Sequence, residues 1–218
     1  GMSVDQSHDF EQIRDYGLLV VYSNWSYLKN QLKENGPYKN RKLGWVAYVS
    51  GKRESRRLLG DYILKEDDLR RHVVHEDGTA ASTWSIDLHY PDPKNTENFP
   101  EREFKSIAKH INIYPYPIPY RCLYSRNVNN LFMAGRDISV THVALGTVRV
   151  MRTTGMMGEV VGMAASICKQ HQVQPRAVYQ RHLEELKALM RTGVGKQGLP
   201  NNQQYNEGGT LTKRPEVK

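Results

Sequence analysis

The sequence predicts a mixed α/β protein, and three observations support that class. Helical and extended patterns alternate along the 218 residues. An apolar fraction of 39% suffices for a buried core, and a charged fraction of 25% is usual for a globular chain. No apolar run reaches the roughly 20 residues that cross a bilayer. These values exclude a disordered polyelectrolyte, a collagen, a disulfide-stapled mini-protein and an integral membrane protein.

The elements of the first half are predicted from apolar spacing and from chain breaks. Apolar residues recur at three- and four-residue spacing over 9–33, which predicts a helix that ends at Asn35-Gly36-Pro37. Three β-rich runs predict strands: 43–49, 58–64 and 83–90. We expect a short helix at 65–68 and a loop over 91–103. The run 114–120 has a proline at every second position, so we expect an extended edge or a connector.

The second half carries the strongest patterns. The apolar run 130–135 ends in Gly and predicts a buried strand that leads into a tight turn, followed by a polar loop over 136–146. The run 153–171 predicts a helix that is apolar on most sides and therefore buried. Its glycines each cost about 1 kcal/mol against alanine, which indicates close contact with a sheet or a bound molecule. We expect a last helix over 176–191.

Charge and cysteine content leave several partner classes open. The net charge of +8 fits nucleic acid, a membrane surface, an anionic ligand or solubility alone. The two cysteines are too few for a disulfide framework, and their spacing fits no metal site. His72 and His75 have the spacing of helical metal ligands, but no third ligand is evident, so we predict no metal site.

Two short groups of residues fit either a functional role or an ordinary position on the protein surface. The basic residues Lys52, Arg53, Arg56 and Arg57 fit a solvated strand end or a nucleic-acid patch. On a strand, Asp87 and His89 share a face, so they fit an acid–base pair or a surface pair.

The segment from Leu131 to Gly162 combines a buried strand, a glycine turn, a polar loop and a buried helix. The start of such a helix carries amide protons and partial positive charge, so it can hold an anion or a polarised carbonyl. We expect Thr153 or Thr154 to cap it. The alternative is an ordinary strand–loop–helix unit without a ligand.

Four blocks of the chain carry a resemblance to a known family: 44–64, 84–91, 130–165 and 175–183. The third contains Asn130-Leu131-Phe132-Met133-Ala134-Gly135-Arg136-Asp137, and later Gly158-Glu159 and Gly162-Met163-Ala164-Ala165. In this order they resemble FAD-dependent oxidoreductases of two-dinucleotide-binding architecture, distantly similar to the fumarate reductase and succinate dehydrogenase flavoproteins. Members are sometimes labelled xanthan lyase.

The resemblance implies a partial two-domain flavoprotein. It divides the chain into an N-terminal helix, a mixed-sheet portion of a substrate domain, the last strand and helices of an FAD-binding domain, and a flexible tail: 1–37, 38–120, 121–192 and 193–218. The implied activity is hydride transfer between an organic substrate and the flavin.

The resemblance also implies roles for particular residues. The ribityl chain and pyrophosphate of FAD would lie at Gly135, Arg136 and Asp137. The N1–C2=O edge of the flavin would lie at Thr153, Thr154, Gly155 and Met156. Substrate binding or proton transfer would fall to His142, Arg149, His89 and Asp87. Further substrate contacts would come from Arg53 and Trp84.

One departure from the family is large. Nothing before residue 40 matches the strand, G-x-G-x-x-G and helix that bind the ADP half of FAD. A G-x-G-x-x-G occurs at 193–198, but it follows a predicted helix and precedes Pro200, so we interpret it as a loop. We therefore expect the C-terminal part of such an enzyme, which binds FAD weakly or not at all by itself.

Two other functions fit the sequence. One is a polysaccharide lyase of the xanthan type, because proteins of this resemblance are sometimes labelled so, and the abundant tyrosine, histidine and arginine side chains are compatible with it. The other is a basic, non-catalytic binding domain. We expect a small-molecule or carbohydrate substrate, with neither nucleic acid nor membrane as partner. A soluble cytoplasmic or periplasmic protein fits equally, and the sequence leaves the oligomeric state open.

Overall fold

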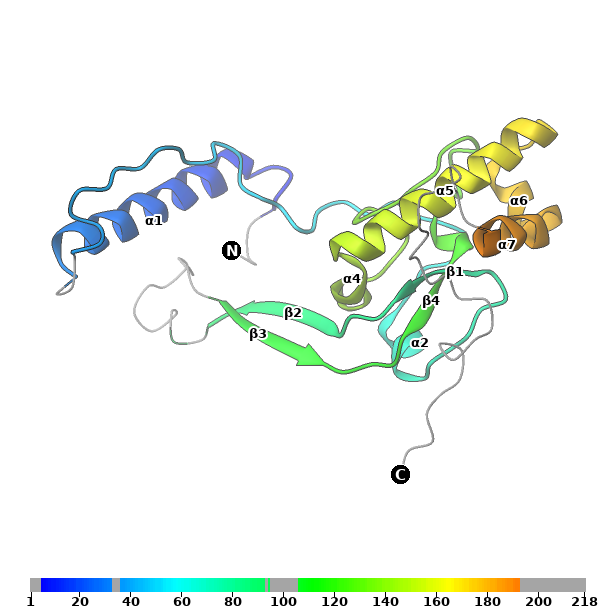
Figure 1. The fold of residues 1–218 in the computed structure, drawn as a ribbon, viewed down its shortest axis with the longest axis horizontal. Helices are drawn as coiled ribbons and strands as arrows, with labels where there is room; N and C mark the ends of the chain where they lie inside the picture. Colours follow the sequence, from blue (N-terminus) through cyan, green and yellow to red (C-terminus); the bar gives the residue numbers. More distant parts are fainter. Residues whose placement is uncertain (1–4, 33–35, 93, 95–105, 193–218) are drawn as a thin grey trace, which may run out of the picture. The chain divides into compact units, whose positions relative to one another are not determined.

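The computed structural model describes residues 5–32, 36–92, 94 and 106–192. The chain divides into two compact units. The first unit comprises 1–55 and 89–108, and the second comprises 56–88 and 109–218. Helices occur together with small antiparallel sheets (Figure 1), which confirms the mixed α/β class. The predicted tail and the G-x-G-x-x-G at 193–198 lie outside the described residues, as does most of the predicted loop 91–103.

The first unit contains the predicted N-terminal helix, α1 (Phe10–Asn30). None of its residues is buried. The guanidinium of Arg14 lies 4.7 Å from the centre of the Tyr48 ring and donates a hydrogen bond to the Tyr48 hydroxyl. The predicted strand 43–49 is wrong, because this segment runs without a strand partner and Trp45 is 82% exposed. Aromatic and β-branched residues favour a strand only where another strand pairs with them.

The described residues form two small sheets. Strand β1 (Gly78–Ser82) pairs antiparallel with β4 (Tyr116–Pro119), with Gly78 opposite Pro119. Strand β2 (Ile86–Pro91) pairs with β3 (Ser106–Ile111). A two-stranded sheet has only edge strands, which accept prolines, so the extended edge predicted at 114–120 is confirmed. The predicted strand 83–90 is confirmed in part by β2.

The helices of the second unit confirm two predictions and correct two others. Helices α2 (Glu66–Arg70) and α5 (Met151–His171) lie where the sequence places them. The predicted polar loop 136–146 is wrong in its second half, because it contains the start of α4 (His142–Val148). The predicted last helix is two helices, α6 (Pro175–Arg181) and α7 (Leu183–Thr192), which are separated at His182.

The predicted strands 58–64 and 130–135 are wrong, because each segment makes only isolated pairings. The amide of Leu58 donates to the Asp137 carbonyl, and the amide of Leu64 donates to that of Ser139. The bridges that remain are Leu64 with Val140 and Tyr124 with Phe132. These short ladders join distant segments without forming a continuous strand. The 3-10 helix η1 (Tyr120–Cys122) leads into them.

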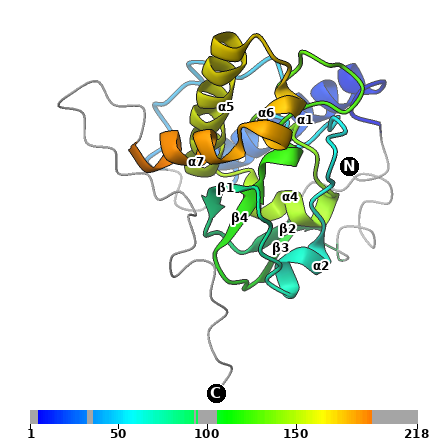
Figure 2. The same cartoon turned by 90° about the vertical axis from the view of Figure 1, so that its right-hand side faces the viewer.

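Helix α5 lies against β1 and beside α6 and α7 (Figures 1 and 2). Only one of its faces is buried, so the prediction of a helix buried on most sides is wrong. That face consists of Thr153, Met156, Met157, Val160, Met163, Ala164 and Ile167. In the part of the chain that the structure describes, no helix is long and apolar enough to cross a bilayer.

A three-residue polar cluster ties the 58–64 segment to α6. Arg176 donates to both carboxylate oxygens of Asp61, at 2.6 and 2.7 Å, and the Tyr124 hydroxyl donates to one of them at 2.8 Å. The bonds from Arg176, followed by that from Tyr124, lower the pKa of Asp61. Burial opposes this shift, but the hydrogen bonds outweigh it.

This lowered pKa predicts acid sensitivity. A carboxyl whose pKa is lower in the folded chain stabilises the fold above its unfolded pKa of about 3.9, and the contribution disappears as pH falls through the folded pKa. We therefore expect Arg176→Gln to be less stable than the parent at neutral pH, with a difference that shrinks below about pH 4. Urea unfolding across a pH series measures it. A difference that stays constant into strong acid would contradict the assignment.

Candidate functional site

Helix α4 is fixed to the β1–β4 sheet by buried polar contacts near its C-terminal end. The hydroxyl of Ser82 donates to the Thr147 carbonyl at 2.8 Å, and the hydroxyls of Tyr116 and Thr147 lie 2.6 Å apart. At Gly146 the helix touches strand β2, because a Cβ there would lie 2.9 Å from the backbone nitrogen and oxygen of Asp87. Glycine is therefore required for this approach, and α4 is held at both sheets.

This attachment positions Arg149, which directly follows α4. Its Nη2 donates to the Asp87 carbonyl at 2.8 Å. The carboxylate of Asp87 lies 3.7 Å from Nε2 of His110 on β3. The structure thus joins two predicted residues, Asp87 and Arg149, and adds an imidazole that the sequence analysis missed. No strand was predicted at 106–111, so nothing in the sequence placed His110 opposite Asp87.

Helix α5 begins at Met151, and only Val150 lies between it and Arg149. Its N-cap is Val150, which offers no side-chain cap, and the first intrahelical bond runs from the Thr154 amide to the Val150 carbonyl. The prediction that Thr153 or Thr154 caps the helix is wrong, since the helix begins two residues earlier. Thr153 is buried, and the Thr154 hydroxyl donates to the Met151 carbonyl.

The result is a positively polarised helix end. Amides of a first turn have no acceptor inside their own helix, and they carry partial positive charge. Met151, at the tip, is 90% exposed. Arg149 comes two residues before the first residue of α5 in the chain, and its side chain carries a positive charge. Such an end stabilises an anion or a carbonyl that gains negative charge.

The glycines of α5 lie on its exposed face. At Gly155, Gly158 and Gly162, no described residue would come within 4 Å of an added Cβ. The sequence offered two reasons for these glycines, and the first, close contact with a sheet, is therefore wrong as a prediction. The other reason, approach by a bound molecule, stays a prediction. Open space beside Gly155, in the second turn of α5, suits a flat ring near this end of the helix.

The predicted glycine turn is confirmed. Gly135 has φ +101°, a conformation that favours glycine over other residues. Arg136 and Asp137 follow on the exposed side of this turn, and the Asp137 carbonyl accepts from Leu58. Exposed side chains after a fixed turn can reach a sugar hydroxyl or a phosphate.

Of the other predicted site residues, Met156 is buried in α5, and the remaining four are exposed. His142 is the first residue of α4, so seven helical residues, about 10 Å, separate it from the Arg149 end. Trp84 is 46% exposed. Arg53 and His89 are exposed residues of the first unit.

His72 and His75 do not have the helical spacing that metal ligands would need. Helix α2 ends at Arg70, and His72 has φ +52°. The ring of His75 packs 4.6 Å from that of Tyr62. Burial lowers the pKa of His75. Both rings belong to packed surroundings beside α2.

Comparison with known proteins gives one match. The model of a family described as FAD dependent oxidoreductase matches residues 3–190, which is most of the chain. No curated protein and no solved structure matches the chain significantly.

Proposed function

This chain belongs to the FAD-dependent oxidoreductase family, and from that premise we propose that its second unit forms the wall of a flavin site around the reacting ring. One observation carries the proposal: the α5 helix begins two residues after Arg149 without a side-chain cap, and there is open space beside Gly155. Bound FAD would accept or donate the hydride of an organic substrate. The protein supplies position and charge.

The residues present fit such a ring in three ways. The first-turn amides of α5 and the Arg149 guanidinium would stabilise negative charge on the N1–C2=O edge. Gly155 leaves the space in which the ring would lie. The exposed turn at Gly135, Arg136 and Asp137 would hold the ribityl hydroxyls and a phosphate, for which guanidinium geometry is suited.

Binding and proton transfer on the substrate side are also part of the proposal. The Asp87 carbonyl fixes Arg149, so the guanidinium is oriented before any ligand arrives. Asp87 and His110 place a carboxylate and an imidazole 3.7 Å apart, and both side-chain types can act as general acids or bases. His142 and Trp84 of the second unit remain candidates for contact with the organic substrate. Arg53 and His89 belong to the first unit and stay predictions from the resemblance.

We propose that these 218 residues by themselves hold FAD weakly. The strand, G-x-G-x-x-G and helix that bind the ADP half are not found in the sequence before residue 40. If the chain contacts mainly the flavin ring, ribityl chain and first phosphate, FAD and FMN should bind with similar, weak affinity. Fluorescence titration with both measures this. Stoichiometric flavin in the purified chain, or a strong preference for FAD over FMN, would contradict it.

A substitution at Gly155 separates fold from flavin binding. We expect Gly155→Ala to raise the free energy of unfolding by about 0.5–1 kcal/mol, because alanine favours a helix and its methyl group meets open space. The same methyl group should weaken flavin binding. Urea unfolding and flavin fluorescence measure the two effects.

Gly17→Ala is the matched control. Gly17 lies within α1 of the first unit and has equally open surroundings, so it should leave flavin affinity unchanged. If Gly155→Ala binds flavin as well as the parent does, the ring does not lie against this turn.

A further inference from the structure

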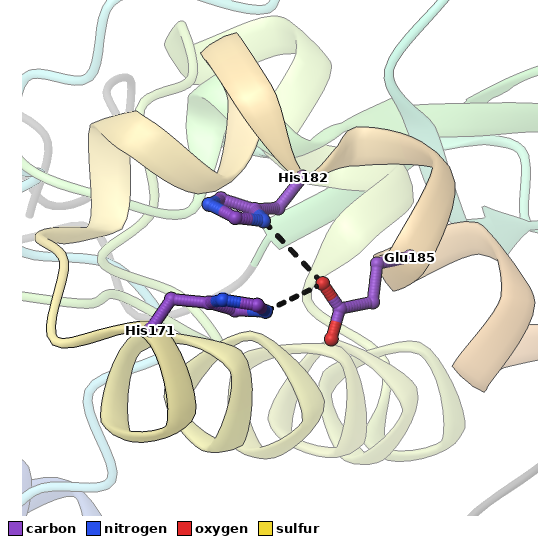
Figure 3. Close-up of side chains that lie close together, drawn as sticks. All are labelled: His171, His182 and Glu185. Atoms are coloured by element: carbon purple, nitrogen blue, oxygen red, sulfur yellow. Dashed lines mark hydrogen bonds and ion pairs between the residues drawn. The ribbon is translucent and has the colours of Figure 1, made fainter.

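Three metal-ligating side chains meet at the opposite end of α5. His171 is the last residue of α5, His182 lies at the break between α6 and α7, and Glu185 lies in the first turn of α7 (Figure 3). We propose that they form a binding site for one divalent transition-metal ion, with Zn²⁺ as the best match. The proposal is independent of the flavin site, which lies a 21-residue helix away, about 30 Å.

The donor atoms converge on one point. One carboxylate oxygen of Glu185 lies 2.9 Å from Nε2 of His171 and 3.4 Å from Nδ1 of His182 (Figure 3). The donor atoms of the three residues all lie within 4.8 Å of one another. Tetrahedral Zn²⁺ bonds to these atoms at about 2.0–2.2 Å, which places neighbouring donors about 3.3–3.5 Å apart. The donor distances therefore need shifts of less than about 1.5 Å, and the stacked imidazoles must also rotate so that both nitrogens point at the ion.

The backbone holds each of the three residues firmly. The C-cap of helix α5 is Gln172, which has φ +52°. The Cys168 carbonyl accepts hydrogen bonds from the amides of Gln172 and Val173. The amide of His182 donates to the Val178 carbonyl, and its own carbonyl accepts from Leu186. Leu186 is fully buried, so α7 cannot turn away from α5 without exposing it.

The imidazole rings of His171 and His182 are stacked on each other. Their ring centres are 4.1 Å apart, and the ring planes differ by 26°. The two nitrogens that face Glu185 lie near the same carboxylate oxygen. A metal ion would replace any proton on these nitrogens and use the same three atoms.

The chemistry of the three side chains favours Zn²⁺ over Mg²⁺ or Ca²⁺. Imidazole nitrogen is a ligand for zinc, cobalt, nickel and copper, whereas magnesium and calcium prefer oxygen. The side chains of His171 and Glu185 are about one third exposed, at 33% and 34%. Three protein ligands at a partly open position leave room for a water molecule as the fourth ligand. Such an ion would clamp α5 to the α6–α7 pair.

Cobalt titration of the full-length chain, with no affinity tag, tests the site. Co²⁺ replaces Zn²⁺ in such sites and gives visible absorption bands that report its ligands. We expect one equivalent of Co²⁺ per chain with nitrogen and oxygen ligation, displaced by Zn²⁺, and a thermal midpoint several degrees higher with Zn²⁺. His182→Gln and Glu185→Gln should each weaken binding at least tenfold.

His8→Gln is the matched control. His8 lies 3.0 Å from the Asp5 carboxylate in an exposed pair, but among the described residues no third donor atom joins these two in a cluster. This substitution should leave Co²⁺ binding unchanged. Binding that is equal in the parent and in His182→Gln, or bands typical of thiolate ligation, would overturn the proposal.

A measurement on the parent chain guards against variants that fail to fold. Paramagnetic Co²⁺ should broaden the ring proton signals of His171 and His182 at one equivalent and leave that of His8 sharp. Unaffected His171 and His182 signals would show that the cluster is an ion pair between helices only.

Discussion

Replacement of Asp77 by alanine should lower the free energy of unfolding by about 3 kcal/mol, at the low end of the range for breaking a buried ion pair. Asp77 is fully buried, and its carboxylate accepts three hydrogen bonds of 2.9 Å from Arg121: one from the amide and two from the guanidinium. Asp77 also raises the pKa of Arg121. The guanidinium is 22% exposed, so it regains some hydration when the partner is removed, which limits the loss.

Asp67→Ala is the control for this prediction. Asp67 pairs with Arg71 at 3.1 Å within one helical turn, but both side chains are more than half exposed. Such pairs contribute about 0.3–0.5 kcal/mol, so the control should be close to the parent. Urea unfolding of the two variants at neutral pH makes the comparison. Equal losses would mean that burial of the Asp77 pair does not determine its contribution.

Gly60→Ala should destabilise the second unit by about 3 kcal/mol, at the upper end of the range for overpacking in a core. A Cβ at this position would lie 2.3 Å from the Arg121 carbonyl oxygen and 3.1 Å from the Tyr124 carbonyl oxygen. Both obstacles are backbone atoms, which cannot rotate away as a side chain would. The 58–64 segment must therefore move away from η1 and the segment that follows it.

The thermal midpoint measures this effect. At about 2–4 °C per kcal/mol for a chain of this size, Gly60→Ala should melt about 6–12 °C lower. Gly162→Ala is the control, because no described residue comes within 4 Å of its Cβ and alanine favours the helix. The control should melt at or slightly above the parent. A Gly60→Ala protein that melts with the parent would show that the two segments are not in close contact.

The candidate site could be predicted from the sequence only in part. Three parts of the site carry local signals. Arg149 is a charged residue shortly before a helix, Asp87 is a polar residue on a strand, and Gly155 is a glycine near the start of α5. His110 carried none, because its relation to Asp87 depends on strand pairing across a distance of more than 20 residues. The cap was misplaced because helix ends depend on local backbone geometry that side-chain types specify only loosely.

The metal cluster shows the same limit. His182 and Glu185 are near in sequence, but His171 reaches them only because α7 packs against α5. Three ligands with a spacing of eleven and three residues match no local pattern. The sequence analysis therefore predicted no metal site, and the proposal depends on tertiary contacts.

The sequence by itself determined the α/β class, the long helices α1 and α5, the glycine turn at Gly135 and membership of the flavoprotein family. These depend on local periodicity, on the backbone conformation of single residues and on ordered blocks of side chains. Tertiary structure alone decided that α4 forms within a polar stretch, that 58–64 and 130–135 make only isolated bridges, and that the helix glycines face open space. Helix packing, strand pairing and burial join residues far apart in the chain, so their outcome is settled only when the whole fold is in place.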